Sequence, residues 1–210
     1  MKYDLHIHTH YSRCSNLKPQ LILKLAKKHK LDGIAITDHH EIKGALEVKK
    51  LNRDDNFDVI IGEEISTNYG DVLVYNLNKK IDSIDFFDVV DEVRKQSALM
   101  SIAHPFRTTF LHDHKFQLPI KQVSGRIDAV ECFNARTLPG DNKKAHLAAD
   151  SIKIAKTGGS DSHFFFEIGT AFTEFEGGLR SALKDKKTSV GGTIKFGAFG
   201  GALSFIKKRF

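Results

Sequence analysis

Two histidines near the start of the chain have the spacing of a metal-binding pair. His6 and His8 end a strand-like run that begins at Tyr3. Side chains two residues apart on a strand point to the same side, so both imidazoles can bind one ion and leave positions open for water and substrate. A His-x-His pair also arises by chance at the polar end of a strand, so this pair alone does not establish a metal site.

Four later segments repeat this arrangement. Each is a strand-like run that ends in histidines or carboxylates, namely Asp38 with His39, Glu64, His104, and Asp161 with His163. In a β/α barrel the carboxyl ends of the strands share one face, where active sites are built. Mixed imidazole and carboxylate ligands favour Zn, Mn or Fe over Ca or Mg, and a carboxylate such as Glu64 can bridge two ions. The five segments together predict a divalent metal centre.

The elements that would carry these residues alternate between strands and helices. Strands are expected at residues 3–7, 33–37, 59–62, 71–76, 99–103, 129–133, 152–157 and 169–175. Helical spacing of apolar residues predicts helices near residues 19–30, 43–51, 86–93, 143–150 and 179–183. The alternation predicts a parallel β/α architecture in a single domain covering residues 1–210, with a basic amphipathic segment at about 195–210 that docks on the barrel.

The composition, with 40% hydrophobic and 28% charged residues, is that of a soluble globular protein. No apolar run reaches the roughly 18 residues of a membrane span, and no signal-peptide pattern is present, so no membrane partner is expected. Two cysteines, Cys14 and Cys132, provide no disulfide framework and favour a cytoplasmic location. The net charge of +6 favours phosphate-bearing partners, from nucleotides to nucleic acids. Oligomeric state is left open.

The motifs D-L-H-I-H-T-x-x-S, I-T-D-H, G-E-E-I-S-T, A-H-P and G-S-D-S-H occur in this order between Lys2 and Gly169. This ordered set resembles the PHP (polymerase and histidinol phosphatase) family. The resemblance implies a single-domain distorted (β/α)7 barrel, two or three divalent ions and hydrolysis of phosphoesters. In that family pattern, His6, His8, Glu64 and Asp161 look like the first metal site, Glu64 and His104 the second, and His39 with His163 part of the third.

The chain also departs from the family pattern at two positions. Many relatives carry a histidine on the strand after the glutamate motif, where this chain has Leu73. Cys14 stands where relatives often have Asp or His, and it is either a third ligand beside His39 and His163 or a small residue that fills a loop. Glu64 rather than Glu63 matches the family glutamate.

Other residues are candidates for different roles. Asp38 is expected to orient a loop or a neighbouring ligand rather than to bind metal. We assign catalytic roles to Arg107, Asp161 and His163, and substrate-binding roles to Arg107 and Asn134; Arg107 as an exposed structural arginine, and Asn134 with Arg136 as loop caps, are the alternatives. Phe164, Phe165 and Phe166 would stack on a base or sugar or be buried in the core, and burial is favoured. The histidines expected at the surface or in loops are His10, His29, His40, His112, His114 and His146.

Four functions are compatible with these residues. The favoured one is hydrolysis of a small phosphomonoester or nucleotide by metal-activated water, with Arg107 neutralising charge on the phosphoryl group. A nuclease that trims DNA or RNA ends with the same cluster is the alternative. A non-catalytic RNA-binding scaffold ranks last because such a scaffold has no need of metal ligands, and an amidohydrolase with a similar cluster remains open.

Overall fold

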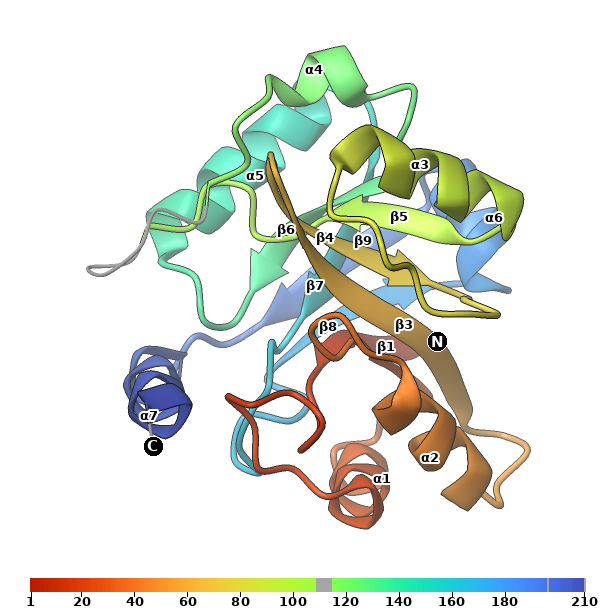
Figure 1. Ribbon diagram of the computed structural model, residues 1–210, viewed down its shortest axis with the longest axis vertical. Coiled ribbons are helices and arrows are strands. Elements are labelled where there is room, and N and C mark those ends of the chain that lie inside the picture. The colour runs from red at the N-terminus through yellow and green to blue at the C-terminus, as the bar shows by residue number, and fades with distance from the viewer. Residues whose placement is uncertain (109–114, 196, 210) are drawn as a thin grey trace.

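The computed structural model of this protein describes residues 1–108, 115–195 and 197–209, and Figure 1 shows a strongly curved β-sheet flanked by helices. Within these residues the strands form one nine-stranded sheet in the order β7-β6-β5-β4-β3-β2-β1-β8-β9. The strands are β1 (Lys2–Ile7), β2 (Gly33–Ile36), β3 (Asp58–Thr67), β4 (Gly70–Tyr75), β5 (Leu99–Ile102), β6 (Ala129–Asn134), β7 (Ala155–Gly159), β8 (Ala171–Phe175) and β9 (Thr188–Gly192).

The first seven strands come close to closing into a barrel. The groups β1–β2–β3 and β5–β6–β7 each run parallel. Just after β7, Ser162 accepts a backbone hydrogen bond of 3.0 Å from His8 N and donates one of 3.3 Å to His6 O. Gly159 permits this approach, because a Cβ there would lie 2.4 Å from Cβ of His6. The expected distorted β/α barrel is therefore confirmed as a nearly closed mixed sheet.

Apolar side chains from the strands fill part of the barrel interior. Each strand from β1 to β7 contributes to one buried cluster through Leu5, Ala35, Ile60, Leu73, Leu99, Ala129 and Ala155. The register of β1 against β2 shifts between Asp4 and Ile7, an irregularity of the bulge type. This irregularity explains how two successive residues of β1 can both point into the barrel. Leu5 packs in the apolar cluster, whereas His6 faces polar residues nearer the mouth of the barrel.

The helices are α1 (Pro19–Lys28), α2 (Lys43–Leu51), α3 (Phe86–Lys95), α4 (Ile120–Val123), α5 (Pro139–Ile152), α6 (Leu179–Lys184) and α7 (Gly197–Arg209). Local sequence explains where some of them begin. Pro19 occupies the first position of α1, and the Asp85 carboxylate accepts hydrogen bonds from Phe87 N and Asp88 N at the start of α3. In the described ranges, none of these helices combines the length and the apolar character needed to cross a bilayer.

Strand β4 departs from the parallel arrangement that the alternation of strands and helices predicts. It runs antiparallel to both neighbours, β3 and β5. Only Asn68 and Tyr69 separate β3 from β4, a connection too short for the crossover that a parallel pair requires. The expected end of β3 at Gly62 is also wrong, because pairing with β4 extends the strand to Thr67 and leaves Glu64 inside it rather than at its end.

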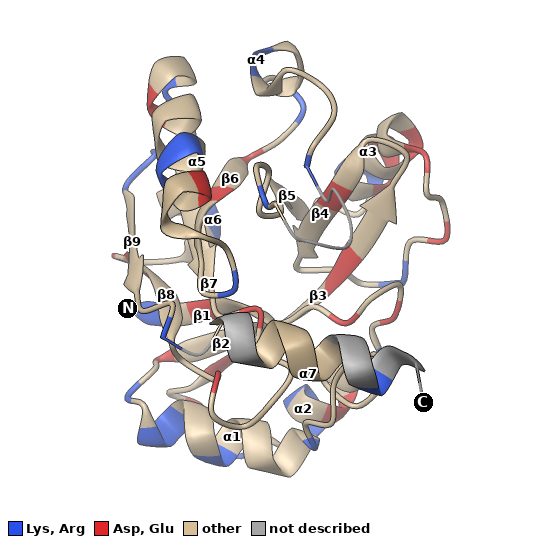
Figure 2. Cartoon of the chain, turned by 90° about the vertical axis from the view of Figure 1, so that its left-hand side faces the viewer, with Lys and Arg blue, Asp and Glu red and all other residues tan. Residues whose placement is uncertain are grey.

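The C-terminal third of the chain differs in its element boundaries. Helix α5 runs on to Ile152, so β7 starts at Ala155, later than expected, and ends at Gly159. Elements α4, β9 and α7 were not predicted. The basic segment expected at 195–210 contains the whole of α7, while residues 196 and 210 lie outside the described residues. Figure 2 shows α7 in front of the strands. The helix lies against the loops after β1, β6 and β7, because Lys207 Nζ donates to Ser15 O, Gly197 approaches Ala135 and Gly200 approaches Glu167.

Candidate metal centre

His6 and His8 lie at the closing seam of the barrel, and their side chains face one another. Their Nε2 atoms are 3.1 Å apart, and both residues are fully buried. His6 Nδ1 lies 2.9 Å from the Glu131 carboxylate, which can only accept, so Nδ1 carries the proton and Nε2 offers a lone pair. The pair therefore presents two nitrogen donors to one point, as its spacing predicts.

A second chain of hydrogen bonds orients His8. Ser12 Oγ donates to Asp38 at 2.6 Å and lies 3.2 Å from His8 Nδ1, so it accepts the proton of that nitrogen. Asp38 also accepts from Thr9 N at 2.7 Å and from Thr9 Oγ1 at 2.6 Å. Asp38 thus holds the loop and, through Ser12, the ring of His8, as expected of a residue that orients a ligand.

Glu64 lies at the meeting point of the histidines. Its Oε2 atom is 3.4 Å from His6 Nε2, 3.2 Å from His8 Nε2 and 3.0 Å from His39 Nδ1, and its Oε1 is 3.1 Å from His104 Nε2. Yet Oε2 is buried and makes no hydrogen bond within the described part of the chain. Burial alone would raise the pKa of Glu64, but His39 and His6 outweigh it and hold that pKa well below the usual range. A buried, negatively charged oxygen that lies close to several nitrogens but accepts no hydrogen bond is the arrangement expected where these atoms bind a cation between them.

Asp161 faces the same point from the loop after β7. Its Oδ1 lies 3.4 Å from His8 Nε2 and 3.7 Å from His6 Nε2. Its Oδ2 accepts hydrogen bonds from Arg107 Nη1 at 2.7 Å and from Asn134 Nδ2 at 3.3 Å. Burial would raise the pKa of Asp161, but His6 and Arg107 hold it well below its usual value. One carboxylate oxygen is thus oriented by Arg107 and Asn134 while the other faces the histidines.

His39 and His163 complete this side of the cluster. His163 Nδ1 lies 2.8 Å from the carbonyl oxygen of Asp161, so Nδ1 carries the proton and Nε2 is free. Burial and the nearby Arg136 guanidinium lower the pKa of His163 well below its usual value, which keeps the ring neutral. A neutral imidazole is the form that binds a metal.

Three sets of potential ligand atoms result, each with all its atoms within 4.8 Å of one another. They are His6, His8 and Asp161; His8, His39 and His163; and Glu64, Asp71 and His104. His8 belongs to two of them. These donor sets fit divalent transition metals, because they combine imidazole nitrogens with carboxylate oxygens and enclose the buried, unsatisfied Oε2 of Glu64. Two of these potential ligands, His104 and Asp161, have positive φ angles of 26° and 55°, a backbone strain that the surrounding structure must hold.

Asp71 was not predicted as a ligand. It lies two residues before Leu73, so both side chains point to the inner face of β4, and Leu73 is the cross-strand partner of Glu64. Because β4 is antiparallel, its first residues rather than its last lie at the mouth of the barrel. Leu73 itself offers no ligand atom, and the carboxylate at Asp71 lies 4.0 Å from His104 Nε2.

Cys14 stays apart from the three ligand sets in the described ranges. Its side chain is buried, and burial raises the pKa of its thiol to about 12. Glu63 points away from the cluster, and its Oε2 accepts a hydrogen bond from Ile81 N at 3.1 Å. Glu131 is the functional neighbour that the sequence did not reveal: it accepts from His6 Nδ1, from His104 N at 2.8 Å and from Asn134 Nδ2 at 3.1 Å.

The residues that the sequence suggested for roles other than metal binding are partly buried and partly exposed. Arg107 is mostly buried and paired with Asp161, so it is not an exposed structural arginine. Arg136 is buried against Glu167 and does not line the site. Phe164 is buried, but Phe165 is 59% exposed, so the expectation of burial is wrong for Phe165.

The six histidines set aside as surface or loop residues lie in several environments. His10 and His29 are exposed and His40 is half-buried, while His146 is half-buried within α5; His112 and His114 lie outside the described residues.

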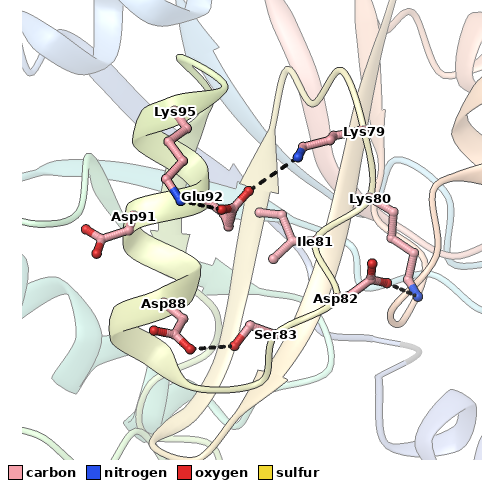
Figure 3. Close-up of a pocket in the computed structure, with 9 residues that line it drawn as sticks. All are labelled: Lys79, Lys80, Ile81, Asp82, Ser83, Asp88, Asp91, Glu92 and Lys95. Carbon is pink, nitrogen blue, oxygen red and sulfur yellow. Dashed lines mark hydrogen bonds and ion pairs between the residues drawn. The ribbon is translucent and has the colours of Figure 1, made fainter.

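Surface cavities lie apart from this centre. One of about 400 Å³ lies between the segment before α3 and α3 itself, as Figure 3 shows. Its lining includes Lys79, Asp88 and Glu92, and it contains none of the potential ligands. Figure 2 shows Lys and Arg mainly on helices and loops, whereas strands such as β3, β4 and β6 carry acidic residues. Three of the acidic residues on these strands, Glu64, Asp71 and Glu131, belong to the ligand sets or contact them.

The chain matches the family model described as the PHP domain over residues 4–168. It is 35% identical over 148 residues to the uncharacterized protein MJ1587 of Methanocaldococcus jannaschii, covering 64% of this chain and 82% of that protein.

Two solved structures resemble the fold. One, from Bacteroides vulgatus, is a two-domain protein containing a predicted PHP-like metal-dependent phosphoesterase, with a TM-score of 0.76 and 20% identity over 92% of this chain. This chain spans 65% of that protein's length. The other is the lesion-specific endonuclease PfuEndoQ of Pyrococcus furiosus, with a TM-score of 0.59 and 15% identity, covering 90% of this chain and 57% of that one.

Proposed function

The chain belongs to the PHP domain family and is a metal-dependent hydrolase, and we propose that it cleaves a small phosphomonoester or a nucleotide. The observation that carries the proposal is the convergence of four imidazoles on the Glu64 carboxylate. These imidazoles and Glu64 also belong to the three sets of potential ligands. His6, His8, His39, Glu64, Asp71, His104, Asp161 and His163 would hold two or three divalent ions. Such ions supply Lewis acidity, which activates water and neutralises phosphoryl oxygens.

The protein's own groups would orient the substrate. Arg107 Nη1 donates a hydrogen bond to Asp161, and Arg107 Nε is buried without a hydrogen-bond partner among the described residues. Since Nη1 of the same guanidinium contacts Asp161, the group is near enough to the ligand sets to bind a phosphoryl oxygen placed between the ions and Arg107. Asn134, whose amide reaches both Asp161 and Glu131, keeps Asp161 aimed at the site rather than binding substrate directly.

Phe165 supports a substrate with a flat leaving group. It lies two residues after His163 and is 59% exposed, while its neighbours Phe164 and Phe166 stack on each other with ring centroids 5.9 Å apart. An exposed aromatic ring beside a metal ligand offers a face on which a base can stack. We therefore include nucleotides in the proposed substrate class.

The test is elemental analysis of the purified protein followed by an activity screen. The screen would use phosphomonoesters and nucleotides with Mn, Zn and Fe, and would compare wild type with Asp161→Ala. We expect bound divalent metal and phosphate release that is lost in Asp161→Ala. Wild-type protein that holds no metal, or activity that survives in Asp161→Ala with its metal content unchanged, would refute the proposal.

A nuclease is the second candidate. The net charge of +6 and the fold shared with an endonuclease favour it. Binding to a polyanion releases counterions, so nuclease function predicts that substrate affinity falls steeply with salt. A shallow salt dependence, together with preference for mononucleotides over oligonucleotides, would select the phosphatase.

A further inference from the structure

A buried ion pair lies behind the loop that carries His163. Arg136 Nε is 2.8 Å from Glu167 Oε1 and Arg136 Nη2 is 2.7 Å from Glu167 Oε2, a two-point contact. The two side chains are 3% and 2% exposed. Such a pair is geometrically specific, because two parallel hydrogen bonds fix both groups in one plane.

The Glu167 carboxylate also holds the backbone at His163. Its Oε2 accepts hydrogen bonds from His163 N at 2.9 Å and from Phe164 N at 3.0 Å. Because His163 Nδ1 is bound to the Asp161 carbonyl, the ring and the main chain of this residue are fixed from two sides. Glu167 thus determines where the free Nε2 of His163 points.

Helix α7 packs on this pair from outside. Arg136 Nη1 donates to Ser204 Oγ at 3.0 Å. At Gly200, a Cβ atom would lie 1.8 Å from Glu167 Oε1 and 2.6 Å from its Cδ. The next residue, Gly201, would place a Cβ with nothing within 4 Å. The helix therefore reaches the carboxylate only because residue 200 has no side chain.

We propose that Arg136 and Glu167 are positioning residues for His163, and that α7, packed against them at Gly200, controls metal affinity at the His8, His39 and His163 set. The inference rests on the proposed function, because it assumes that this set binds an ion. Residues that orient a metal ligand contribute roughly 10- to 100-fold to metal affinity, and a displaced Glu167 carboxylate releases two backbone donors at once.

The two adjacent glycines give a matched test. Gly200→Ala and Gly201→Ala make the same chemical change in the same helix, so they alter helix propensity alike, but only the first collides with Glu167. Metal-free wild type, both variants and Glu167→Gln would be titrated with Co²⁺, following visible absorption and ion stoichiometry. Circular dichroism would check that each variant is folded.

We expect Gly200→Ala and Glu167→Gln to bind one ion about 10- to 100-fold more weakly than wild type while the other ions bind normally. Gly201→Ala should match wild type. If Gly200→Ala does not fold, Glu167→Gln alone decides, since it keeps the size of the side chain. Equal affinities in wild type, Gly200→Ala and Glu167→Gln would overturn the inference but leave the proposed function standing. A wild type that takes up no divalent ion would overturn both.

Discussion

Replacing Glu131 by glutamine tests whether a single carboxylate orients potential ligands of two metal sites, His6 in one and His104 in the other. Glu131 Oε1 accepts from His6 Nδ1, and Oε2 accepts from His104 N and Asn134 Nδ2. A glutamine amide offers one acceptor oxygen and one donor nitrogen. If its nitrogen faces His6, it opposes the Nδ1 proton; in the flipped orientation it opposes His104 N and Asn134 Nδ2. Either way a buried donor meets a donor.

The magnitude follows from that conflict. A buried donor left without an acceptor costs about 1–3 kcal/mol, and 1.4 kcal/mol corresponds to tenfold. His6 can escape by moving its proton to Nε2, but this removes the lone pair that would bind the ion. Glu131→Gln should therefore weaken metal binding by about 5- to 150-fold. Activity at limiting metal should fall by a similar factor, and excess metal should restore part of it.

The assay is competition of the metal-free protein with a chromophoric chelator, paired with phosphate release across a metal series. Glu63→Gln is the matched control, because Glu63 is also a buried carboxylate but faces Ile81 on the opposite side of β3. A Glu131→Gln protein that is folded, and that binds metal as tightly as the Glu63→Gln control, would refute the role assigned to Glu131.

Four other outcomes are expected. His8→Ala should lose two ions and His39→Ala only one, because His8 alone belongs to two ligand sets; elemental analysis showing equal losses would contradict those sets. Arg107→Lys should retain more activity than Arg107→Ala, since lysine keeps the charge and loses the fork, and steady-state rates equal to wild type in both would exclude a role in binding phosphate. Cys14→Ser should keep the wild-type metal content, whereas loss of one ion would make the thiol a ligand. Burial and the hydrogen bond to Asp58 raise the pKa of Tyr3, so the stability that its hydroxyl contributes to the fold is complete below the unfolded pKa of about 10 and is lost as the pH rises through the folded pKa. Tyr3→Phe should therefore be about 1–2 kcal/mol less stable than wild type at pH 7, and thermal unfolding should show this difference narrowing above about pH 10.

The sequence predicted the positions of most strands because buried strands read as short apolar runs that end in polar residues. His6, His8, His104, Asp161 and His163 all follow such runs, and the structure brings them together. The same logic failed for Asp71. It begins a strand rather than ending one, and only the reversed direction of β4 carries it to the mouth of the barrel.

Residues that act through other residues were harder to find. Glu131 lies inside β6, where alternation alone marks it as a buried polar residue without saying what it contacts. The pairing of Arg136 with Glu167 spans 31 positions, and its link to α7 spans 68. No local pattern encodes such pairings, because they depend on how the barrel closes.

The sharing of His8 between two ligand sets has a consequence for how the centre fills. Metal-free, His6 and His8 have raised pKa values despite burial, because Asp161, Glu64 and, for His6, Glu131 favour their protonated forms. An ion at either set has to displace a proton from the His8 ring, so metal uptake at both sets is coupled to proton release. Metal uptake by the protein should accordingly acidify the solution, and the affinity for metal should weaken as the pH falls.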